Sequence, residues 1–306
     1  MGSEFLALTL PPMVIATLAA LACAGPGTFL LLRRQSLLGD AMAHVVLPGI
    51  VAAFLLSGSA APGVMLGGAL AAAALSSLLI EAIRRLTRID PGAAMGVVFT
   101  AMFASGVLLL ELSGAGGVHL DVEHALYGNL ESLIWLDATG WPSLLDPAAL
   151  ATLPPEVPIL GLTAAGILLA IRLVWRPLSI ATFDEGFAAT LGIPTRALSA
   201  ALVGLTALAA VTAFSAVGSI LTIAMLICPA ATARLLTDDL GRQMRLSLLT
   251  GAASAILGTW AAGYLPLLLG LDFTVSAAGS IATVSGLMLA LAATYGPRRH
   301  ATAPQA

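Results

Sequence analysis

An acid and a histidine, Asp40 and His44, lie four positions apart in a segment whose other side chains are mostly apolar. Residues at this spacing share one face of a helix. A carboxylate oxygen and an imidazole nitrogen on one face can bind the same divalent cation. If the segment crosses a membrane, an acid within it is costly enough to be a candidate for function. The pair predicts an ion site, and the alternative is a helix–helix hydrogen bond or an acid near a span end that reaches water.

The composition indicates that this segment lies in a lipid bilayer. Of the 306 residues, 59% are hydrophobic and 9% are charged, and the mean hydropathy is +1.01. A soluble domain averages about 25% charged residues. A surface this poor in charge cannot keep the chain in solution, so we expect an all-α polytopic membrane helix bundle.

Apolar stretches of about 20 residues, the length that crosses a bilayer, recur along the chain. They predict nine transmembrane helices, with eight as the alternative. The prolines at positions 11, 12 and 26 predict a kink in the first span, and the seventh, which contains Pro229, is expected to be short, broken or partly re-entrant. The predicted spans are 7–32, 36–57, 62–83, 92–113, 157–175, 197–217, 218–233, 246–268 and 277–296.

The basic side chains other than histidine are thirteen arginines in five clusters, and the chain has no lysine. If the N-terminus is outside, every cluster falls on the cytoplasmic side of the predicted spans, as the positive-inside rule requires. We therefore predict an N-terminus outside and a C-terminus in the cytoplasm. The clusters are Arg33 and Arg34; Arg84, Arg85 and Arg88; Arg172, Arg176 and Arg196; Arg234, Arg242 and Arg245; Arg298 and Arg299.

The longest stretch between predicted spans, residues 113–155, falls on the outer side. It carries five acids, two histidines and two tryptophans but no arginine. We expect much of residues 121–136 to form an amphipathic helix at the interface, with tryptophan at headgroup depth. The acids either solvate a loop or form a docking surface or cation funnel. His119 and His124 are further ligand candidates, with plain surface positions as the alternative.

A second predicted region of interest is cytoplasmic and covers residues 176–196. The run DEGFAATLG from Asp184 to Gly192 predicts a short helix across the membrane face, ended by Gly192 and Pro194. A short rigid helix seated on another protein could transmit a push from it. The alternative is an ordinary connecting helix.

Several enzyme classes lack their motifs here. A phosphate-binding GxxxxGK[ST] loop is absent, so the chain is not predicted to be an ATPase. HExxH and GxSxG are also absent, and an enzyme with Asp40 and His44 as an acid–base pair would lack a nucleophile or cofactor motif. Cys23 and Cys228 lie apart in apolar runs and are expected to act as small hydrophobes. We expect a transport subunit without catalytic residues or a bound cofactor, driven by energy from elsewhere.

Three segments resemble one protein family. Residues 29–49, FLLLRRQSLLGDAMAHVVLPG, resemble the N-terminal signature of the permease subunits of ABC-type manganese, zinc and iron importers, the ABC-3 family. Residues 217–244 resemble a later part of these permeases. Residues 183–194 are similar to the loop with which such permeases engage their ATPase. Together the matches extend from about residue 25 to about residue 286.

The resemblance implies a type II ABC importer (BtuC-like) permease fold in a bacterial plasma (inner) membrane. A single permease domain would cover residues 6–300, between a probable cloning scar at 1–5 and a tail at 301–306. The implied partners are ATP-binding cassette subunits, an extracytoplasmic metal-binding protein, a second permease and lipid, with no nucleic acid. The coupling residues would be Asp184, Glu185, Ala188 and Gly192.

The transported ion is predicted to be Mn²⁺, with Zn²⁺ or Fe²⁺ as alternatives. Carboxylate and imidazole suit manganese, and no thiolate is near the pair in sequence. Residues 237–244 also look more like the manganese and iron branch of the family. One rival function is a related permease for iron-siderophore, haem or cobalamin. Another is an ATPase-independent transporter or channel, which typically shows inverted repeats that are not evident here.

Overall fold

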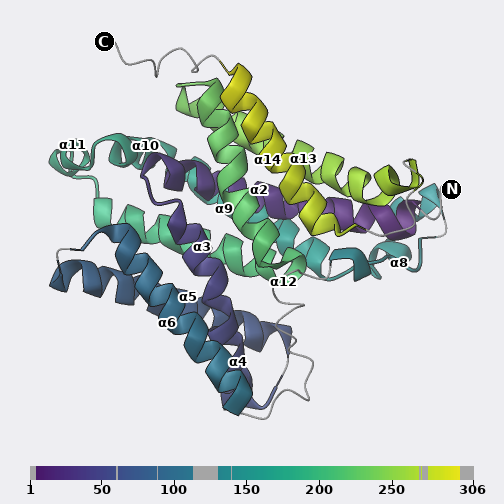
Figure 1. Ribbon diagram of the computed structural model, residues 1–306, viewed down its shortest axis with the longest axis horizontal. Coiled ribbons are helices and arrows are strands. Elements are labelled where there is room, and N and C mark those ends of the chain that lie inside the picture. Colours follow the sequence, from purple (N-terminus) through teal and green to yellow (C-terminus); the bar gives the residue numbers. More distant parts are fainter. Residues whose placement is uncertain are drawn as a thin grey trace.

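The computed structural model describes residues 5–59, 61–87, 89–112, 130–138, 140–268, 270 and 275–296, and all regular elements in these ranges are helical. The all-α prediction is therefore confirmed (Figure 1). The longer helices are α2 (Leu10–Leu32), α3 (Leu37–His44), α4 (Val46–Ser57), α5 (Pro62–Leu86), α6 (Pro91–Leu112), α9 (Glu156–Leu173), α10 (Trp175–Phe183), α12 (Thr195–Leu236), α13 (Leu240–Leu268) and α14 (Ala277–Tyr295). The short elements are η1 (Phe5–Thr9), η3 (Leu130–Ser132), η4 (Trp141–Leu144), α8 (Pro147–Leu150) and α11 (Glu185–Thr190).

Seven helical segments in the described part of the chain are long and apolar enough to cross a membrane. They are residues 5–32, 63–83, 92–112, 156–173, 195–236, 240–268 and 277–295. All nine predicted stretches are helical, but three of them differ from simple spans. Residues 197–217 and 218–233 join in α12, and residues 36–57 are divided between α3 and α4.

The two halves of α12 meet at Gly218, whose φ of 80° and ψ of 174° are not helical. Glycine tolerates this conformation because it has no Cβ. The halves consequently run in different directions (Figure 1). The predicted boundary between the sixth and seventh spans falls at this break. The second half continues through Pro229 to Leu236, so the proline does not end it.

The division of residues 36–57 occurs at Val45, between α3 and α4. Pro48 has no N–H to donate, and its ring clashes with the carbonyl of the residue four positions earlier, which is His44. The helix that carries the predicted ion site therefore ends at His44. By contrast, α2 continues through Pro26, and Pro11 and Pro12 lie in its first turn, where no N–H is needed.

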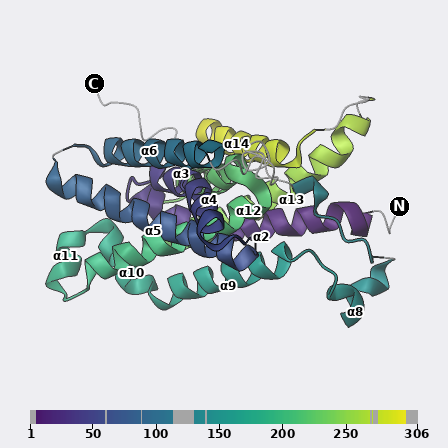
Figure 2. The same cartoon turned by 90° about the horizontal axis from the view of Figure 1, so that it is seen from below.

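The centre of the bundle is formed by α2 and α12. Helix α12 packs against α2, α3, α5, α9, α13 and α14, and Figure 2 shows α9 on one side of this centre and α13 and α14 on the other. Small residues permit this packing: a Cβ at Gly27 of α2 would collide with the Leu226 carbonyl oxygen of α12. Close backbone approach at small residues is typical of helices packed in membranes.

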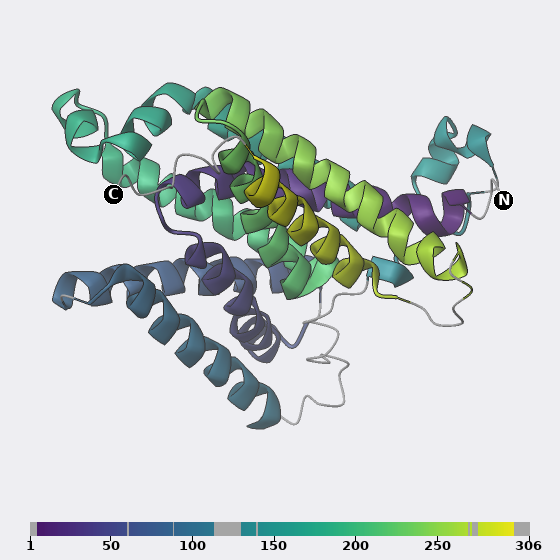
Figure 3. The same cartoon turned by 45° about the horizontal axis from the view of Figure 1, so that its top comes forward.

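A second group consists of α4, α5 and α6, which pack against one another. Here a Cβ at Gly49 of α4 would collide with the carbonyl oxygen of Gly68 in α5. Helix α3 contacts α4 and α6 of this group and α2 and α12 of the central group (Figure 3). The fold thus places the helix with Asp40 and His44 at the junction of two helix groups.

Residues 130–138 limit the extent of the predicted amphipathic helix. Residues 121–129 lie outside the described part, but Leu130–Ser132 forms only a 3-10 turn and residues 133–136 are not helical, so no amphipathic helix extends to 136. Trp135 is buried in the protein. Its Nε1 donates to the Ala149 carbonyl oxygen at 2.9 Å, and its backbone N–H donates to the Ala7 carbonyl oxygen at 2.9 Å. Of the two tryptophans between residues 130 and 155, Trp141 is the exposed one.

Candidate functional site

The helix of the predicted ion site is held by its apolar face. Leu38, Met42 and Val45 are buried in the main core. A Cβ at Gly39 would lie 2.8 Å from Leu226 Cδ1, so glycine lets α3 lie close against α12. These contacts fix α3 within the fold although it has only eight residues.

Asp40 and His44 are the fourth and eighth residues of α3, so the structure confirms that they lie one helical turn apart. The Asp40 side chain is outside the part that the structure describes. In the described residues, no group of three or more His, Cys, Asp or Glu side chains could hold a metal ion. Asp40 and His44 alone are too few ligands for a complete coordination shell, which needs others such as waters, backbone carbonyls or a second subunit.

The His44 ring lies between two aromatic residues of α6. It stacks on Phe99, with ring centroids 5.4 Å apart and planes 24° apart. Phe103, one turn further along α6, meets it edge to face, with centroids 5.6 Å apart and planes at 76°. Such contacts favour one ring orientation. Sequence reasoning did not identify the two phenylalanines, and their four-residue spacing is the only signal that could have done so.

The predicted cytoplasmic helix is present as α11, which follows α10 after a turn at Asp184. The Asp184 carboxylate accepts a hydrogen bond from the Phe187 N–H at 2.8 Å and so caps the N-terminus of α11. After Thr190, Gly192 adopts a φ of +74°, and the Ile193 N–H donates to the Ala188 carbonyl oxygen at 3.1 Å. This is the glycine-based helix ending that the sequence predicted.

One face of α11 is anchored to the bundle and another is exposed. Ala188 is fully buried in a small cluster with Ala181 of α10 and Leu198 of α12. Phe183, Phe187 and Leu191, spaced four residues apart, are 62%, 54% and 54% exposed. Three large apolar side chains are therefore exposed at and beside this capped helix.

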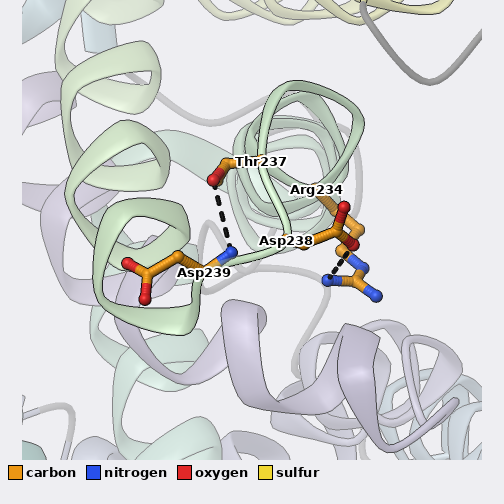
Figure 4. A network of polar contacts seen from close by, with 4 residues as sticks. All are labelled: Arg234, Thr237, Asp238 and Asp239. Atoms are coloured by element: carbon orange, nitrogen blue, oxygen red, sulfur yellow. Dashed lines mark hydrogen bonds and ion pairs between the residues drawn. The ribbon is translucent and has the colours of Figure 1, made fainter.

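The turn from α12 to α13 lies within residues 237–244, the segment that resembles the manganese and iron branch of the family. Figure 4 shows its polar contacts: the Asp239 N–H donates to Thr237 Oγ1 at 3.3 Å, and Arg234 Nη1 lies 3.5 Å from Asp238 Oδ1. The Asp239 carboxylate also accepts the Arg242 N–H at 2.7 Å and caps α13. In this structure these polar residues end one helix and begin the next.

The other histidines and acids between residues 113 and 155 are further candidates for binding an ion. His119 and His124 lie outside the described residues. Glu131 accepts a hydrogen bond from the Ala277 N–H at the start of α14, and Asp146 accepts one from the Ala148 N–H at the start of α8. Glu131 and Asp146 therefore accept hydrogen bonds from backbone N–H groups at helix N-termini.

The fold has solved counterparts. The structure described as PsaBC from Streptococcus pneumoniae in complex with Fab superposes with a TM-score of 0.75 and 27% identity, over 95% of this chain and 92% of that chain. Among similar sequences, the manganese transport system membrane protein MntD of Bacillus subtilis is 37% identical over 286 residues, which are 93% of this chain and 91% of MntD. The zinc transport system membrane protein TroD of Treponema pallidum is 34% identical over 95% of this chain and 75% of its own length.

One protein-family model also matches most of the sequence, over residues 6–137 and 148–296. These ranges include α3 with the Asp40–His44 pair, helix α11 and, apart from Phe5, all residues of the candidate spans. The chain belongs to the ABC 3 transport family.

Proposed function

We propose that this chain is the membrane permease subunit of an ATP-driven importer of divalent metal ions, with Mn²⁺ as the favoured substrate. The observation that carries the proposal is the placement of Asp40 and His44 one turn apart on α3, where two helix groups meet. Family membership and the resemblance to proteins named for manganese and zinc transport support it. ATP hydrolysis belongs to a separate subunit, so the permease is not itself an enzyme.

In this proposal Asp40 and His44 form a transient station for the ion. The carboxylate and the imidazole compensate for part of the lost hydration, and incomplete coordination by the chain lets the ion leave again. The aromatic contacts of Phe99 and Phe103 hold the His44 ring in one orientation. Waters, backbone carbonyls or the second permease complete the shell. ATP binding and hydrolysis shift the permease between outward-facing and inward-facing states.

The preference for manganese is based on ligand chemistry. A carboxylate oxygen and an imidazole suit Mn²⁺, whereas soft thiolates favour Zn²⁺. The two cysteines lie on α2 and α12, not on α3. Proteins named for manganese transport and for zinc transport are both similar to this chain. Transport measurements are therefore needed to distinguish the two ions.

The segment Asp184–Gly192 is proposed to engage the ATPase. Asp184 and Gly192 define the two ends of α11, and the buried Ala188 anchors it to α10 and α12. The exposed Phe183, Phe187 and Leu191 supply an apolar surface for a groove on the ATPase, and Glu185 adds a charge beside it. Because α11 is anchored, a push on its exposed face would move α10 and α12 with it.

The other proposed partners are a second permease, identical or not, and an extracytoplasmic metal-binding protein, in a bacterial inner membrane. The arginine clusters support an outside N-terminus and a cytoplasmic C-terminus. In Figure 1 the α5–α6 connection and α11 lie at the left end, whereas the N-terminus and α8 lie at the right end. The two ends would face opposite sides of the membrane.

Topology is tested with two leucines of nearly equal exposure, Leu86 at 85% and Leu145 at 87%. Each is replaced by cysteine in a variant in which Cys23 and Cys228 are alanine, and intact cells are treated with a membrane-impermeant thiol reagent. We expect Leu145→Cys to be labelled and Leu86→Cys to be labelled only after lysis. Equal labelling of both positions in intact cells would refute the orientation.

The function itself is tested in proteoliposomes that contain the permease, its ATPase and the binding protein. We expect ATP-dependent accumulation of free Mn²⁺, competition by Zn²⁺ and no accumulation of an iron-siderophore. Uptake of the chelate instead of the free ion would favour the rival permease class. Uptake of Mn²⁺ by the permease without the ATPase would favour a secondary transporter or channel.

A further inference from the structure

We propose that Arg33 is a positioning residue that links the ATPase-facing helices α10 and α11 to the ion-site helix α3. The inference rests on the proposed function, because it assigns the path by which a push on α11 reaches Asp40 and His44. It concerns a residue that touches neither the ion nor the ATPase. The contacts of Arg33, described below, come from three different elements.

The Arg33 guanidinium joins two helices distant in sequence. Its Nε donates a hydrogen bond to Thr182 Oγ1 in α10 at 3.1 Å, and its Nη1 donates to Ser199 Oγ in α12 at 2.9 Å. The two acceptors lie 149 and 166 residues away in the chain. A planar guanidinium presents several donors in a fixed fork, so one arginine can hold both elements in a set geometry where a lysine could not.

A second contact fixes the other end of α10 to the same helix. Phe29, one turn before Arg33 in α2, packs edge to face against Trp175, the first residue of α10, with centroids 5.7 Å apart. Thr182, the acceptor of Arg33, is the penultimate residue of α10. The end of α2 therefore holds α10 by an apolar contact at its start and a polar contact at its end. A displacement of α10 acts directly on α2 at Arg33.

The chain after Arg33 leads at once to the ion-site helix. Arg34 has a φ of +57° and, among the described residues, is the one non-glycine residue with positive φ. The Gln35 N–H donates to the Leu30 carbonyl oxygen at 2.8 Å, which closes this turn. Helix α3 then begins at Leu37. A tight turn in a conformation that costs an L-residue free energy leaves little slack between Arg33 and α3.

The charge of Arg33 is also tied to α11. Burial of the guanidinium lowers the pKa of Arg33, and the nearby carboxylate of Glu185, the first residue of α11, opposes this effect. The Nη2 atom is buried and has no hydrogen-bond partner among the described residues. A buried guanidinium is stabilised chiefly by its acceptors and by nearby negative charge. A shift of α11 that moves Glu185 therefore alters the energy of the link itself.

The test measures how many Mn²⁺ ions are transported per ATP hydrolysed, in proteoliposomes with the complete transporter. We expect Arg33→Gln to lower this ratio about tenfold, the effect of losing one or two charge-assisted hydrogen bonds. ATP hydrolysis should continue at a rate close to that of the original chain. The matched control is Arg172→Gln, which removes an exposed arginine from α9 and should leave the ratio unchanged.

A second variant keeps the arginine and removes its acceptors. Thr182→Val with Ser199→Ala should lower the same ratio, because Arg33 then has no partner in α10 or α12. A purely structural role would lower assembly, hydrolysis and uptake in proportion, and an unchanged ratio in either variant would overturn the inference. Failure of the original transporter to carry Mn²⁺ would instead count against the proposed function, so the two failures are distinguishable.

Discussion

Replacing Asp40 by asparagine should abolish most metal uptake while the permease still folds and assembles with its ATPase. The amide keeps the size of the side chain but removes the charge that compensates for stripping water from a divalent ion. We expect uptake at limiting Mn²⁺ to fall about a hundredfold, since even indirect partners of metal ligands are worth about 10- to 100-fold. Initial rates of ⁵⁴Mn²⁺ uptake in proteoliposomes measure this effect.

Three companion variants make this prediction specific. His44→Ala removes the nitrogen ligand and should have a similar effect, whereas Asp40→Glu retains an oxygen and should lose less activity. The double variant of Asp40→Asn and His44→Ala should be little worse than either single one, because residues of one site act non-additively. If Asp40→Asn took up Mn²⁺ as fast as the unmodified chain and the ATPase still co-purified with it, Asp40 would not be part of an ion site.

The second large effect is expected at Gly192. Its φ of +74° ends α11, and a Cβ there would meet no atom within 4 Å, so the expected penalty comes from the backbone conformation. A β-branched residue is the least compatible with positive φ. Gly192→Val should therefore displace the end of α11 and lower uptake about tenfold while ATP hydrolysis continues, since such strain costs about 1–3 kcal/mol.

Two controls separate backbone strain from loss of a glycine. Gly192→Asn should retain most activity, because asparagine tolerates the left-handed conformation. Gly186→Ala lies in the same helix at a helical position and should also be tolerated. Glu185→Arg, which reverses a charge at the start of α11, should loosen the ATPase or uncouple hydrolysis from uptake. If both Gly192→Val and Glu185→Arg showed normal ATP-coupled uptake, α11 would not be the coupling element.

The sequence by itself determined the features that depend on local patterns. Hydrophobic stretches of bilayer length predicted helices that the structure contains, and the boundary placed at residues 217 and 218 falls on Gly218. The same holds for α11, because Asp184 and Gly192 have the local chemistry of a helix cap and a helix end. The four-residue spacing of Asp40 and His44 needed only helical geometry.

The sequence interpretation missed two features, the burial of Trp135 by distant contacts and the break within residues 36–57. Tryptophan is a residue type common at membrane interfaces, but the indole N–H of Trp135 donates to the Ala149 carbonyl oxygen and its side chain is buried in the protein. Residues 36–57 read as one continuous span, whereas Pro48 ends the helix at His44 and leaves α3 packed between the two helix groups.

The tertiary structure alone decided what surrounds the candidate site. Phe99 and Phe103 reach His44 from α6, and Arg33 reaches Thr182 and Ser199, which lie 149 and 166 residues away in the chain. No periodicity encodes such pairs, because they depend on which helices become neighbours when the whole bundle packs. In a membrane that choice is made by close approach of small residues and by polar side chains that need partners, both of which are properties of the folded chain.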